Sequence, residues 1–196
     1  MAYTKKTLAD LKQSLCDRHD SGVLPTDSAT LTFWTRLLNR GQAYCADKLR
    51  LTKSTSLTTV SGTIALPDDF IAIERVFEGT TEHVQIGIGD VASQDTDLYF
   101  WITGNHDSGF SLNTEEDVAL TVIYSYRVPE MTTNIDECVI PDPEAVVAYA
   151  YSFLRKSETD PIGDADSALQ ECDNRLIEIQ SVQNINDGGI GFSFNA

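Results

Sequence analysis

The acidic triplet Glu115-Glu116-Asp117 is the place where residue types and spacing come nearest to a catalytic arrangement. Two carboxylates about 5–10 Å apart across a sugar cleft cleave glycosidic bonds when their surroundings differ. Three consecutive acids in front of a hydrophobic run instead indicate an exposed turn, in which all three have similar surroundings. We therefore interpret the triplet as a turn and keep a peptidoglycan-cleaving hydrolase that uses Glu115 or Glu116 as an alternative.

Other residue types that support catalysis or metal binding lack the required spacing. The three histidines are far apart in the sequence: His19, His83 and His106. They form no HExxH pair, so we expect no zinc site. Asp160, Asp164 and Asp166 lack the glycine and the terminal glutamate of an EF-hand loop, and helix capping explains them better. The sequence contains neither a nucleophile-elbow serine nor a phosphate-binding glycine loop. We expect no enzyme, no metal and no cofactor.

The cysteines are widely separated and lie among apolar neighbours: Cys16, Cys45, Cys138 and Cys172. Such residues are usually buried free thiols, and two disulfides are the alternative. No apolar run follows Met1, so we expect no secretory signal. Together these features indicate a protein made in a reducing cytoplasm.

Charge is distributed unevenly along the chain. Residues 1–53 carry a net charge of +4 and residues 54–196 a net charge of −20, which gives −16 overall. Nucleic-acid binders need basic groups that displace counterions from phosphates, and the acidic part offers few of these. The default interpretation of this part is a solvated acidic surface, and the sharper hypothesis is a surface that faces DNA without binding it. The basic first helices are expected to face acidic surfaces of a neighbouring copy.

Two pairs of helices are predicted, at residues 7–50 and 142–183, on either side of a strand-rich region at residues 53–127. Thr7 and Asp10 have the spacing of a capping box at the first helix. Gly41 falls inside the second helix, where glycine costs about 1 kcal/mol relative to alanine. It indicates either a close helix–helix contact or an incidental glycine.

These patterns predict an α+β fold. We expect a helical bundle formed from the N- and C-terminal helix pairs, with a central antiparallel β insertion and an extended C-terminal arm. The expected parts are the N-terminal bundle helices at 1–53, the β-rich insertion at 54–127, the C-terminal bundle helices at 128–183 and the arm at 184–196.

The third helix, which starts near Pro143, is apolar on every side. A helix of this kind is buried all round. In a small domain it either occupies a central position or forms a subunit interface. The candidate interface residues are Val146, Val147, Tyr149 and Tyr151.

Two further apolar groups are candidates for docking. Tyr99 and Trp101 share one face of a predicted strand, where they contact a subunit, stack on a sugar or pack in the core. The arm places apolar residues at alternate positions among glycines and polar residues: Ile190, Phe192 and Phe194. An extended segment of this kind suits docking into a groove or onto a sheet edge, and a solvated terminus is the alternative.

Three segments occur in a familiar order: Thr7–Leu11, Ala65–Val76 and Pro141–Ala150. They have the pattern of an opening helix, an LPxDF-type strand entry and a P…A…YA helix. In this respect the chain resembles the head–tail adaptor, or connector, proteins of tailed bacteriophages. The resemblance spans most of residues 5–183 and implies a structural role.

The resemblance also implies an assembly. Such adaptors form a ring, commonly of twelve copies, beneath the portal at the neck of the virion, after assembly in the host cytoplasm. The ring extends the DNA channel, passes double-stranded DNA without specific binding, and docks the next tail, stopper or nozzle protein. C-terminal arms of the family often reach toward the portal, which assigns Ile190, Phe192 and Phe194 as anchors. No membrane contact is implied.

Other functions remain as alternatives to the adaptor. A stopper, tail-terminator or other neck-completion protein would form a hexamer that binds the adaptor rather than the portal. A free-standing sugar-binding module would use Trp101. The hydrolase described above would be an enzyme of the virion.

Overall fold

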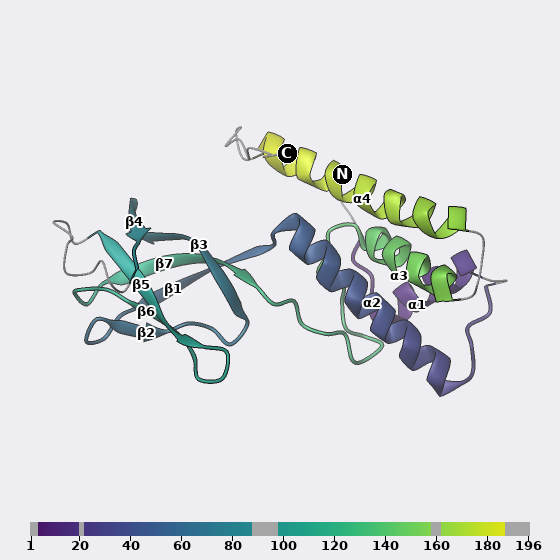
Figure 1. The fold of residues 1–196 in the computed structure, drawn as a ribbon, viewed down its shortest axis with the longest axis horizontal. Helices are drawn as coiled ribbons and strands as arrows, with labels where there is room; N and C mark the ends of the chain where they lie inside the picture. Colours follow the sequence, from purple (N-terminus) through teal and green to yellow (C-terminus); the bar gives the residue numbers. More distant parts are fainter. Residues whose placement is uncertain (1–3, 20–21, 88–97, 158–161, 187–196) are drawn as a thin grey trace. The chain divides into compact units, whose positions relative to one another are not determined.

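The computed structural model describes residues 4–19, 22–87, 98–157 and 162–186 (Figure 1). Within these ranges the chain forms four helices and seven strands. It divides into two compact units. The helical unit extends over Met1–Arg50 and Val128–Ala196, and the β unit over Leu51–Arg127.

The helices of the helical unit are α1 (Leu8–His19), α2 (Ser28–Leu49), α3 (Pro143–Ser157) and α4 (Ile162–Asn186). At α1, the Thr7 N–H donates to Asp10 Oδ2 at 2.9 Å and the Asp10 N–H donates to Thr7 Oγ1 at 3.3 Å, which confirms the capping box. Asp27 caps α2 by accepting a 2.7 Å hydrogen bond from the Thr30 N–H. None of the helices in the described ranges combines the length and the apolarity needed to cross a lipid bilayer.

The apolar helix α3 lies at the centre of the helical unit, because α1, α2 and α4 each pack against it (Figure 1). Ala145–Ala150 is buried throughout. Gly41 lets α2 approach α3 closely: a Cβ atom there would lie 3.0 Å from the Val146 carbonyl oxygen and 3.2 Å from Tyr149 Cδ1. Gly41 therefore marks a close helix–helix contact, which is the first of the two interpretations given above.

The strands of the β unit are β1 (Thr52–Thr58), β2 (Thr63–Ala65), β3 (Phe70–Glu78), β4 (Thr81–Gln85), β5 (Tyr99–Asn105), β6 (Gly109–Asn113) and β7 (Ala119–Tyr126). They form one sheet with the order β1-β7-β3-β4-β5-β6-β2. The two outermost strands, β1 and β2, follow one another in sequence, and a Val60↔Thr63 bridge closes the turn between them. The first and last strands of the sheet are therefore connected by a short turn, and the sheet is nearly closed into a barrel. Its core includes Val76, Leu112 and Val122.

The predicted fold class, a helical bundle with a central antiparallel β insertion, is wrong. The chain instead combines four helices with a seven-stranded mixed sheet. The strands β4 and β5 run parallel, with Val84 opposite Tyr99 and Gln85 opposite Phe100. Local alternation of apolar residues identifies strands but carries no information on their order or direction, which depend on pairings distant in sequence. The predicted arm lies mostly outside the described residues.

The four cysteines are buried free thiols, as the sequence predicts. Cys45 on α2 and Cys172 on α4 bring their sulfur atoms to 3.9 Å. The hydrogen bond with Cys172, together with burial, raises the pKa of the Cys45 thiol. Burial raises the pKa of Cys138 to about 11. Cys45 and Cys138 are therefore protonated at neutral pH, and all four cysteine side chains are buried in the helical unit.

Candidate assembly surfaces

The acids of the Glu115-Glu116-Asp117 triplet are all exposed, in the turn before β7. Asp117 Oδ1 accepts a 2.7 Å hydrogen bond from the Gly62 N–H, which ties this turn to the β1–β2 connection. The three side chains share one solvent-exposed environment. Consecutive exposed acids in one turn do not face each other across a sugar cleft, which is the arrangement that glycoside cleavage needs, so the hydrolase alternative gains no support from them.

The aspartates considered as calcium ligands have structural partners. Asp164 Oδ2 lies 3.6 Å from Arg155 Nη2, and Asp166 Oδ1 lies 3.4 Å from Lys156 Nζ. Both ion pairs connect the start of α4 to the end of α3. Asp164 also stands in the first turn of α4, where the helix dipole favours an anion. Asp160 lies outside the described residues. In the described part of the chain, no group of three His, Cys, Asp or Glu side chains is placed to hold a metal ion.

The candidate interface residues of α3 lie mainly inside the helical unit. Val146 and Val147 are at most 1% exposed, and Tyr149 is 6% exposed. Side chains already buried within one chain add no surface to a subunit contact. Tyr151 alone among the four is partly exposed, so the prediction of an interface on α3 now depends on Tyr151.

Aromatic stacking joins α2, α3 and α4. The ring centroids of Tyr44 and Tyr149 are 4.6 Å apart, and those of Tyr149 and Phe153 are 4.9 Å apart. The Tyr44 hydroxyl donates a 2.8 Å hydrogen bond to Asp173 on α4. Burial and this hydrogen bond raise the pKa of Tyr44. The cluster explains why Tyr149 faces inward, toward α2, rather than toward a partner.

The docking residues predicted on the sheet also differ in exposure. Tyr99 is 2% exposed and Trp101 is half-buried, with ring centroids 6.2 Å apart. Only Trp101 of this pair offers surface to a partner. The arm residues Ile190, Phe192 and Phe194 lie outside the described residues. Docking through Trp101 or through the arm stays a prediction.

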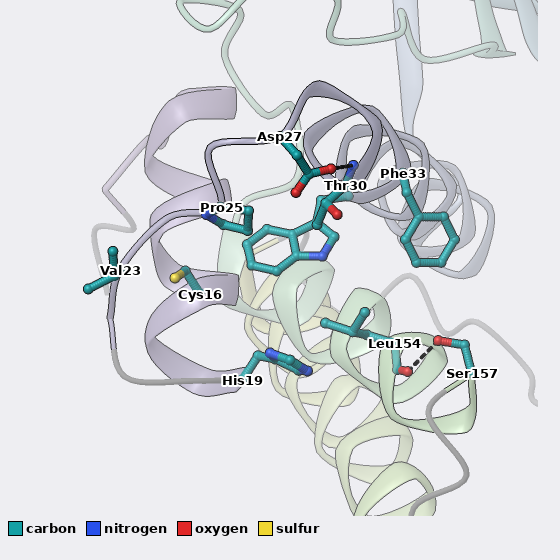
Figure 2. Close-up of a pocket in the computed structure, with 10 residues that line it drawn as sticks. Cys16, His19, Val23, Pro25, Asp27, Thr30, Phe33, Leu154 and Ser157 are labelled. Atoms are coloured by element: carbon teal, nitrogen blue, oxygen red, sulfur yellow. Dashed lines mark hydrogen bonds between the residues drawn. The ribbon is translucent and has the colours of Figure 1, made fainter.

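An open groove lined by both apolar and polar side chains, with a cavity volume of about 330 Å³, lies at one end of the helical unit (Figure 2). Its walls come from α1, α2, α3 and the connection between α1 and α2. Trp34 contributes to the lining and is 3% exposed, whereas Phe33 is 41% and Val23 is 76% exposed. His19 stands 6.1 Å from Trp34, measured between ring centroids. Phe33 and Val23 are the exposed apolar side chains of this groove and offer surface for apolar side chains of a partner.

A chain of ion pairs fixes the positions of α1, α3 and α4. Arg18 on α1 pairs with Glu171 on α4. Arg175 donates to Glu171 at 3.1 Å and to Asp142, at the start of α3, at 2.8 Å. The hydrogen bond from Arg18, followed by that from Arg175, lowers the pKa of Glu171. These partly buried charges therefore hold the helices in register with one another.

Sequence reasoning missed a second positioning device, which holds the segment before α3. The Asn39 side chain on α2 pairs with the backbone N–H and C=O of Met131, at 2.8 and 2.9 Å. The Gln42 side chain, 1% exposed, donates to the Pro129 C=O at 2.9 Å and accepts from the Val139 N–H at 3.0 Å. The sequence does contain a feature that could have indicated this contact: Asn39 and Gln42 are two side-chain amides, three residues apart, among the apolar residues of the helix.

The chain belongs to the SU10 adaptor protein family, whose model matches residues 6–189. This is a family of phage head–tail adaptors, so the resemblance inferred from the sequence is confirmed. A comparison with curated proteins gave no match.

Membership of this family establishes the general class of the protein. The chain is a structural adaptor of a bacteriophage, and its family is not one of enzymes. It is a virion component, and its partners are other head and tail proteins.

Proposed function

We propose that the chain is the subunit of a twelve-membered ring bound beneath the portal of the virion. The ring extends the DNA channel and docks the next component of the tail. The family match, which covers residues 6–189, is the observation that carries this proposal. A contact surface repeated around a closed ring also explains why one small chain needs exposed apolar and charged surfaces outside its two cores.

The charge distribution supports a channel through which DNA slides. Residues 54–196 carry a net charge of −20. Like charges repel the phosphates and keep DNA hydrated and mobile, whereas a basic wall would release counterions and bind it. Passage of double-stranded DNA without specific binding follows from this balance.

The arm provides the proposed contact with the portal. Ile190, Phe192 and Phe194 alternate along the last residues of the chain. In an extended segment such residues share one edge and can enter apolar pockets of a partner together. We assign the portal as that partner because adaptor arms of this family are expected to reach toward it.

Negative-stain electron microscopy of the purified protein, alone and mixed with portal, tests the proposal. We expect a ring coaxial with the portal. Replacing Phe192 and Phe194 together by serine should abolish portal binding, and the matched control Ser193→Ala should retain it. A protein that stays monomeric with portal would refute the ring. A hexamer that ignores the portal would point instead to a stopper or tail terminator.

A further inference from the structure

Two arginines on the exposed side of α2 have no carboxylate partner among the described residues. Arg36 and Arg40 are both exposed, and the guanidinium carbon of Arg40 lies 4.7 Å from the centroid of the Phe153 ring. Most other cations of the described chain form ion pairs: Lys5, Lys6, Arg18, Lys53, Arg75, Arg155, Lys156 and Arg175. In a protein of net charge −16, α2 thus presents uncompensated positive charge.

Apolar surface adjoins this charge. Phe33 is 41% exposed and is part of the lining of the groove. Steps of three and four residues keep Phe33, Arg36 and Arg40 within about 60° of arc on the helix. We call these three residues the α2 face. A partner that fits it must supply apolar side chains together with negative charge.

The same protein carries a surface of that description on α4. Ile177 is 61% exposed and Val182 is 41% exposed. Glu178, which follows Ile177, is also exposed and has no ion-pair partner among the described residues. The three residues fall within about 140° of arc on one side of the helix. We call them the α4 face.

We propose that the α2 face of one copy docks against the α4 face of the next copy. Arg36 and Arg40 then face Glu178, and the aliphatic side chains of α4 cover Phe33 and the rim of the groove. Two different surfaces that meet in this way make a head-to-tail contact, which builds a ring when the rotation from one copy to the next closes. The inference rests on the proposed ring and names the surface that builds it. DNA is the other acidic candidate, but phosphates would leave Phe33 and the groove uncovered.

Charge reversal tests the contact. Arg36→Glu alone and Glu178→Arg alone should each weaken self-association about tenfold, because each places like charges opposite one another. The combination of Arg36→Glu with Glu178→Arg should restore it. The matched control is Arg127→Glu, which makes the same change of charge at an exposed arginine of the β unit and should leave association unchanged. Sedimentation velocity measures association, and circular dichroism verifies that each variant is folded.

The outcomes separate this inference from the proposed function. If the wild-type protein forms rings and Arg36→Glu forms them equally well, the assignment of the contact is wrong while the ring proposal stands. Failure of the combined variant to recover association would also overturn the assignment. If Arg36→Glu loses binding to double-stranded DNA and keeps the ring, the α2 face binds DNA instead. A wild-type protein that never associates, with or without portal, refutes the ring itself.

Discussion

Replacement of Gly41 by alanine tests the close approach of α2 to α3. In an open helix this change would stabilise the protein by about 1 kcal/mol, because alanine has the higher helix propensity. Here the added Cβ atom would lie 3.0 Å from the Val146 carbonyl oxygen, 3.2 Å from Tyr149 Cδ1 and 3.3 Å from Val146 Cγ1. Overpacking of this kind costs about 1–3 kcal/mol. We therefore expect Gly41→Ala to lower the free energy of unfolding by about 1 kcal/mol.

Urea unfolding of the helical unit measures this change. In a Trp101→Phe background the remaining tryptophan fluorescence comes from Trp34, which is 3% exposed in the helical unit. Ala43 is exposed on the same helix, so Ala43→Gly reports the propensity difference without a packing change and should cost about 1 kcal/mol. Suppose instead that Gly41→Ala raises the free energy of unfolding by as much as Ala43→Gly lowers it. The substitution would then show helix propensity alone, and α2 and α3 would not be in close contact at Gly41.

The remaining predictions concern other described residues. Gln42→Leu should destabilise the helical unit by about 1–3 kcal/mol in urea unfolding, since the Pro129 carbonyl and the Val139 N–H both lose the hydrogen bond to the buried Gln42 amide. A loss below about 0.5 kcal/mol would contradict this role. Hydrogen bonds from the backbone and side chains of two threonines lower the pKa of Asp136 to about 2, so its stabilising effect is complete above about pH 4 and is lost as the pH falls through 2. In Asp136→Asn, the free energy of unfolding should therefore fall less than in the wild type between about pH 4 and pH 2. The same fall in both proteins would show that the Asp136 carboxylate does not contribute to stability. The thiols should resist a thiol reagent at about pH 8 in the native protein and all four should react in urea; rapid native labelling of Cys45 or Cys172 would disprove their burial.

The helical part of the fold could be predicted from local sequence because its determinants lie within a few residues of one another. The capping box of Thr7 and Asp10 needs a spacing of three, and an apolar stripe repeats within each turn. Burial of α3 also follows from its composition. Local sequence could not tell whether Val146 meets a neighbouring helix or a neighbouring copy, because both environments are apolar. The structure assigns Val146 to the first.

The sheet and the charged surfaces depend on contacts between residues far apart in the sequence. Alternation identifies β4 and β5 as strands, yet nothing local in either one specifies a parallel pairing. The excess of basic residues before position 53 is visible in the sequence. Which of these cations are neutralised is not visible, because the acid that pairs with Arg18 lies 153 positions away, at Glu171. Only the folded chain distinguishes Arg36, which has no carboxylate partner within the described ranges.

Cryo-electron microscopy of mature virions, averaged about the axis of the portal vertex, tests most directly whether the chain works as one of many identical subunits at the neck. We predict a closed ring of copies coaxial with the portal, with the α2 face of each copy against the α4 face of the next. A solitary copy remote from the portal vertex, or a neck without this protein, would contradict the proposed function.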